Sequence, residues 1–84
     1  MSQLEKMITR LKARPRDYTL IEAKTLLLAL NYYIDNKGRT SGSRIAFKQP
    51  GKSSILLHKP HPGNVLKSYQ IRDLIEILER DGIL

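Results

Sequence analysis

The stretch SRIAFKQPGKSSILLH, residues 43–58, indicates two antiparallel strands joined by a hairpin. Apolar and polar residues alternate in its first half, which is the period of a strand with one buried face. Ile45 and Phe47 are expected to point into the core, and the opposite face is expected to carry Arg44, Ala46 and Lys48. Residues 49–52 contain a Pro-Gly pair typical of a tight connection, so residues 54–58 form the returning strand.

Two helices are predicted before this hairpin and one after it. The patterns that begin at Ser2 and at Thr19 each place a glutamate three residues later, which is the form of a capping box. Pro15 ends the first of these helices. Ser68 is placed to cap the last helix and Gly82 to end it, and its apolar stripe consists of Ile71, Leu74, Ile75 and Leu78.

The second helix is apolar over most of its circumference. Ile21 and Leu28 lie to one side of a main stripe formed by Leu20, Ala23, Leu26, Leu27 and Leu30. A helix with so wide an apolar surface is usually buried on more than one side. We therefore expect it to pack on the sheet and also against the N-terminal helix.

These elements predict one α+β domain over residues 1–84, in the order α-α-β-β-β-α. The third strand candidate is residues 32–34, and the short links favour a three-stranded antiparallel sheet with the helices on one face. Residues 59–67, rich in proline and glycine, are expected to have no regular structure.

The positive charge is concentrated in the middle of the chain. Residues 1–35 carry six Lys/Arg and four Asp/Glu, and residues 73–84 carry one basic and four acidic residues. Residues 36–72 hold eight Lys/Arg and no carboxylate. A field of one sign over that length attracts polyphosphate, so we expect these eight cations to gather on one face that binds nucleic acid, RNA before DNA.

Several other kinds of protein are disfavoured by the same sequence. Cysteine is absent, so disulfides and Cys-based zinc sites are excluded. No apolar run approaches the roughly 20 residues of a membrane span, and no signal peptide is evident, so a cytoplasmic protein without membrane association is expected. No carboxylate lies near the histidines and no nucleotide motif is present, so we expect neither a metal nor a cofactor.

The segment from the glycine-rich loop to the C-terminus resembles the HicA family of toxin–antitoxin systems. The matching features are Gly42-Ser43 opening a strand to Phe47, the hairpin, the His/Pro segment 58–62, Leu66-Lys67, the helix over 70–76 and the closing Asp81-Gly82-Ile83. The resemblance covers residues 19–84, and residues 1–16 look like an added N-terminal helix. It implies a fold like that of double-stranded-RNA-binding domains, metal-independent cleavage of messenger RNA by an endoribonuclease, and a HicB-type antitoxin that covers the active face.

This sequence departs from the family pattern at the residue after Gly42-Ser43. The pattern has a catalytic histidine there, whereas this chain has Arg44, which cannot act as a base near neutral pH. Histidine is the residue type suited to that role, so His61, between two prolines, is our first candidate for the base and His58 the second. The candidate RNA contacts are Arg44, Lys48, Arg39, Lys37, Lys59 and Lys67.

Three functions remain open at this stage. The first is an RNA-cleaving toxin whose base has moved to His61 or His58. The second is an RNA-binding module that has lost cleavage, which Arg44 favours. The third is a protein-interaction subunit whose basic face binds an acidic partner.

Overall fold

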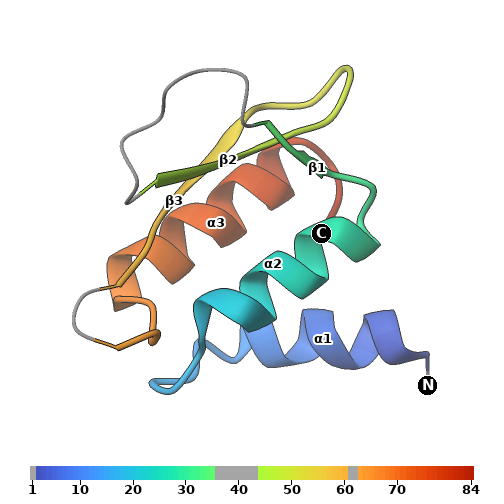
Figure 1. The fold of residues 1–84 in the computed structure, drawn as a ribbon. Coiled ribbons are helices and arrows are strands. Elements are labelled where there is room, and N and C mark those ends of the chain that lie inside the picture. Colours follow the sequence, from blue (N-terminus) through green and yellow to red (C-terminus); the bar gives the residue numbers. More distant parts are fainter. Residues whose placement is uncertain (1, 36–43, 61–62) are drawn as a thin grey trace.

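The computed structural model describes residues 2–35, 44–60 and 63–84, and its three helices lie on one side of a three-stranded sheet (Figure 1). The expected α+β class and the order α-α-β-β-β-α are both confirmed. None of the described helices is long and apolar enough to cross a bilayer. The elements are α1 (Gln3–Lys12), α2 (Leu20–Ala29), β1 (Tyr33–Ile34), β2 (Arg44–Lys48), β3 (Ile55–His58) and α3 (Ser68–Arg80).

The sheet is antiparallel, in the order β1-β2-β3. The predicted hairpin is confirmed, since the Lys52 amide donates to the Gln49 carbonyl at 3.1 Å and Gly51 has a φ of +78°. Proline followed by a glycine of positive φ is the pattern of a type II turn. The predicted alternation is also confirmed, because Phe47 is fully buried while Arg44 is exposed. β1 is shorter than predicted, because Tyr32 enters the core instead.

α3 packs its predicted stripe under the sheet, and all four of its residues are buried: Ile71, Leu74, Ile75 and Leu78. The predicted Ser68 cap is wrong, because Ser68 is already the first helical residue and Lys67 is the N-cap, with no capping side chain. Gly82 ends the helix as expected. Its φ is +75°, and the Ile83 amide donates back to the Leu78 carbonyl at 2.8 Å.

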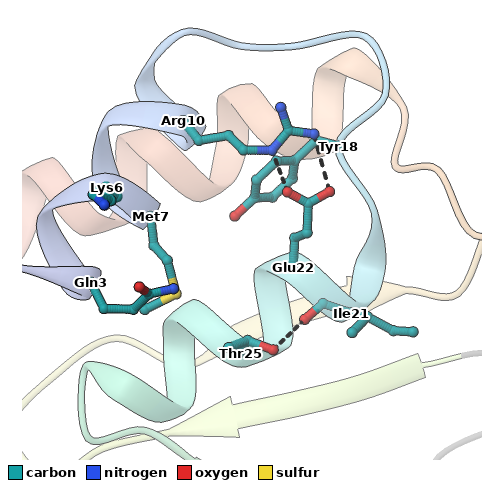
Figure 2. Close-up of a pocket in the computed structure, with 8 residues that line it drawn as sticks. All are labelled: Gln3, Lys6, Met7, Arg10, Tyr18, Ile21, Glu22 and Thr25. Carbon is teal, nitrogen blue, oxygen red and sulfur yellow. Dashed lines mark hydrogen bonds and ion pairs between the residues drawn. The ribbon is translucent and has the colours of Figure 1, made fainter.

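α1 is joined to α2 by an ion pair beside a capping box. The Thr19 box is complete, whereas at α1 the Ser2 hydroxyl accepts from the Glu5 amide and no return bond forms. Figure 2 shows the Arg10 guanidinium bonded to both carboxylate oxygens of Glu22. The same guanidinium lies 5.7 Å from the centre of the Tyr18 ring, so α1 is attached through charge as well as apolar packing.

α2 is less enclosed than its sequence suggested. Ala23, Leu26 and Leu27 are fully buried, and α1 packs against the helix as expected. Ile21 and Leu28, however, remain 64% and 45% exposed, so part of the apolar surface of α2 is left uncovered. The reason is geometric: Ile21 lies on the rim of an open hollow of about 350 Å³ between α1 and α2 (Figure 2).

The loop before α3 contains more structure than its composition predicted. Val65 forms an isolated antiparallel β-bridge with Thr19. The Leu66 amide donates to the Tyr18 carbonyl at 2.8 Å, and the Leu20 amide donates to the Asn64 carbonyl at 2.9 Å. The start of α2 is thereby tied to the segment that leads into α3, although the two are far apart in sequence.

The Arg10–Glu22 pair generates a prediction about acid stability. The hydrogen bond from Arg10 lowers the pKa of Glu22 below its ordinary value. A carboxylate whose pKa is depressed by folding stabilises the protein at neutral pH, and that contribution is lost as the pH falls through the folded pKa. Glu22→Gln keeps a side chain that suits the capping box and removes only the charge. Because both side chains of the pair are partly exposed, we expect a fall in Tm of about 2–4 °C at pH 7.

The measurement is thermal unfolding at several pH values from 7 down to 3. The difference in Tm between Glu22→Gln and the parent protein should shrink toward acid. Glu76→Gln removes an exposed carboxylate of α3 and serves as the matched control. A constant difference across the pH range, or an equal loss in the control, contradicts this role for Glu22.

Candidate nucleic-acid interface

The outer face of the sheet gathers a mixed set of side chains that alternate away from the core. Tyr33 and Leu56 are 53% and 47% exposed there, so an aromatic and an aliphatic side chain are both open to solvent on this face. Exposed aromatic and cationic groups on a sheet are the combination with which nucleic-acid-binding proteins hold bases and phosphates. The register of the three strands places together on this face Tyr33, Lys48, Ala46, Leu56, Arg44 and His58.

Arg44 and His58 are direct cross-strand partners at one end of this face. The His58 amide donates to the Gln70 side chain, away from β2, and the Ala46 carbonyl accepts from the Asp35 amide, away from β3. Both bonds identify Arg44–His58 as a non-hydrogen-bonded pair, the kind whose side chains lie closer. In such pairs the Cβ atoms are about 4.5–5.5 Å apart. His58 therefore lies beside Arg44, the position at which the family resemblance implies a catalytic histidine.

The backbone at His58 is held by α3. Gln70 is only 7% exposed, and its side-chain oxygen accepts from the His58 amide at 3.1 Å. β3 is an edge strand, and among the residues that the structure describes Gln70 is the partner of this amide on the side away from β2. The Gln70 contact was not predicted, although a glutamine directly before the apolar stripe of α3 is the signal that could have revealed it.

Lys48 is paired within the chain. Its ammonium lies 2.7 Å from a carboxylate oxygen of Asp35, and this hydrogen bond raises the pKa of Lys48. The two charges largely offset each other at the β1–β2 edge. Lys48 is thus placed on the predicted face, but it offers a phosphate less attraction than Arg44 does.

The eight cations of residues 36–72 do not all share one face. Lys52 follows the hairpin turn, at the end of β2 opposite Arg44, and its ammonium donates to the Asp81 carbonyl at 3.0 Å. The prediction of a single basic face is wrong for this residue, because a carbonyl at the C-terminal end of α3 attracts it. Three of the predicted site residues lie outside the described part of the chain: Lys37, Arg39 and His61.

Two other described cations of that segment, Lys59 and Lys67, lie toward the Arg44–His58 end of the molecule. Lys59 follows His58 directly, and Lys67 is the N-cap of α3, three residues before the glutamine that contacts His58. Figure 1 shows the end of β3 and the start of α3 at the same end of the molecule. The predicted RNA contacts Arg44, Lys59 and Lys67 are thus concentrated at this end, while Lys48 lies farther along the sheet face.

A family model gives an independent assignment. The model described as the HicA toxin of bacterial toxin–antitoxin systems matches residues 22–83, which is more than half of the chain. No curated protein and no solved structure matches. The match begins inside α2 and ends after α3, so it contains the whole sheet and leaves out α1. The chain belongs to the HicA family of bacterial toxins.

Proposed function

We propose that the chain is an RNA-binding toxin that cleaves messenger RNA in the cytoplasm as an endoribonuclease. The observation that carries this proposal is the direct pairing of His58 with Arg44 on the outer face of the sheet. A side chain able to accept a proton and a permanent cation lie side by side there, on a surface that also exposes Tyr33. Those are the groups that RNA cleavage without a metal requires.

The proposed reaction is attack of a ribose 2′-oxygen on the adjacent phosphorus. The His58 imidazole accepts the 2′-hydroxyl proton as the new O–P bond forms. The Arg44 guanidinium binds the non-bridging oxygens and stabilises the negative charge that develops on them. The bond from phosphorus to the 5′-oxygen breaks, and that oxygen takes up a proton, for which His61 is our candidate donor. The products are a 2′,3′-cyclic phosphate and a 5′-hydroxyl.

We also propose that a HicB-type antitoxin neutralises the toxin by covering the outer face of the sheet. The exposed side chains of Tyr33 and Leu56 support this, since large apolar groups on a sheet face favour a protein partner. Cover over β2 and β3 blocks access to Arg44 and His58 at the same time. The toxin itself requires no cofactor in this scheme.

One observation favours a second function, an RNA-binding module without cleavage. Arg44 occupies the position of the family's histidine, and an arginine cannot accept a proton near neutral pH. If neither His58 nor His61 acts as the general base, the basic surface still binds RNA but does not cleave it.

The two functions are separated by an RNA cleavage assay with the purified protein. We expect cleavage in the presence of a chelator, with 2′,3′-cyclic phosphate ends on the products. His58→Ala should reduce the rate by about 10²–10⁴, the usual contribution of a general base. His61→Ala tests the other candidate for the base and the proposed proton donor.

Lys24→Ala, which removes an exposed cation from α2, is the matched control. Binding without cleavage by the parent protein establishes the module instead. Full activity in His58→Ala with loss in His61→Ala assigns the base to His61 and rejects the assignment to His58.

Gln70 is proposed to position His58 without touching RNA. Gln70→Met keeps the volume of the side chain and removes the acceptor for the His58 amide. We expect faster hydrogen exchange at that amide and a lower kcat, with less change in KM. The Asp35 amide, which donates to Ala46 elsewhere in the sheet, should keep its protection. Unchanged exchange at His58 in this variant rules out the positioning role.

A further inference from the structure

We propose that the segment before the family match supplies one wall of a second phosphate-binding site, a groove between Arg14–Arg16 and the start of α3. Its ligand is the phosphodiester backbone of the RNA that also occupies the Arg44–His58 pair. The inference rests on the proposed function and deepens it. It gives the added N-terminal segment, which the family model does not match, a role in substrate binding.

The groove has a volume of about 730 Å³ and is lined by residues from two segments far apart in sequence. Arg14 and Arg16 stand on one side, and Lys67 and Arg72 stand on the other. None of the described side chains that line it is acidic. Four cations around one hollow form a local field that favours a polyanion.

These cations are not engaged in pairs that stabilise the fold. Within the described residues, no ion pair or side-chain hydrogen bond involves Arg14, Arg16 or Lys67. Arg72 lies 3.6 Å from its neighbour Asp73, and both side chains are 56% exposed, so this contact is weak. Arg10, one turn earlier than Arg14, is instead bound by Glu22.

The backbone holds the two walls in fixed relation. Arg14 has a φ of +50°, a left-handed conformation that is uncommon for an arginine, and its amide donates to the Leu11 carbonyl at 3.0 Å. The Leu66 amide donates to the Tyr18 carbonyl, and this bond joins the segment after Arg16 to the residues just before α3. Arg14 directly follows the C-cap of α1, where a left-handed residue commonly ends a helix, and this conformation leaves the Arg14 side chain exposed beside the groove.

The groove lies at the start of α3, the same part of the helix whose Gln70 contacts His58. The first turn of α3 holds His58 through Gln70, and the residues just before that turn line the groove. In Figure 1 the turn after α1, the start of α3 and the end of β3 lie at the same end of the molecule. Tyr69, also in the lining and 46% exposed, offers an aromatic ring on which a base can stack.

The experiment measures binding of 2′-O-methyl RNA, which lacks the attacking hydroxyl and so stays intact, as a function of salt and RNA length. The test variant is Arg14→Gln with Arg16→Gln. The matched control is Lys6→Gln with Lys24→Gln, which removes the same charge from exposed positions of α1 and α2. Lys67→Gln with Arg72→Gln tests the opposite wall, and circular dichroism verifies the fold of each protein.

We expect the Arg14/Arg16 variant to lose about tenfold in affinity near 0.1 M salt. The slope of log K against log salt should fall by about 1.4–1.8, the effect of two phosphate contacts. The loss should appear with long RNA and vanish with RNA too short to reach from His58 to the groove. The opposite-wall variant should behave in the same way.

Three results overturn the inference and leave the proposed function standing. The first is a loss of RNA affinity equal to that of the control variant, and the second is a loss of RNA affinity that does not depend on RNA length. The third is a loss of binding to poly-glutamate, used as a probe for acidic peptides, with no loss of binding to RNA. Failure of the parent protein to bind any RNA overturns the proposed function and this inference together.

Discussion

The register between β2 and β3 is the constraint on which the outer face depends. Pairing Ile45 with Leu57 and Phe47 with Ile55 sends the apolar residues of both strands into one core. The same register necessarily places Arg44 opposite His58 on the other side. A slip of one residue would exchange the two faces, bury the charges and expose Phe47, so the core itself enforces the pairing. The arrangement of the proposed site is thus a consequence of hydrophobic burial.

The charged side chains of this protein indicate a binding surface only when their ion-pair and hydrogen-bond partners are known. Arg10 and Lys48 both form ion pairs with carboxylates. The pair of Arg10 with Glu22 attaches α1 to α2, and the pair of Lys48 with Asp35 links β2 to the end of β1. Lys52 is similarly occupied by the C-terminal end of α3. Among the described residues, Arg44 and Lys59, which lie opposite His58 in the sheet and directly after it in the chain, have no carboxylate partner. Net charge predicts a polyanionic ligand, and the pairing pattern selects the cations that the proposed binding surface can use.

Local periodicity was sufficient to predict the elements and most of the core. The alternation over β2 and the stripe of α3 placed Phe47 and Leu74 correctly, because each pattern is set by the geometry of its own element. The Thr19 capping box was predicted for the same reason. The N-cap of α3 was predicted one residue too late. The residue at which the helix begins is set by the conformation of the segment before Lys67, which local periodicity does not describe.

The features that sequence could not predict are contacts between distant segments. The bridge from Thr19 to Val65, the Gln70 contact to His58 and the pairing of Lys48 with Asp35 all join residues whose proximity is fixed only by the complete fold. Periodicity shows how apolar the faces of α2 are, yet Ile21 remains 64% exposed. The periodicity contains no information on whether a neighbouring helix approaches closely enough to bury a given face.

The family resemblance implies a catalytic histidine at the position of Arg44, and the sheet places His58 directly opposite that position. General-base chemistry depends on where an imidazole stands relative to the phosphate, and not on which strand carries it. In a non-hydrogen-bonded pair, the neighbouring strand presents its side chain to nearly the same volume. With His58 there, an arginine at residue 44 can bind the phosphate and stabilise charge while the imidazole takes the proton. In the proposed scheme the two roles are divided between β2 and β3, and Gln70 of α3 holds the backbone of β3 by accepting from the His58 amide.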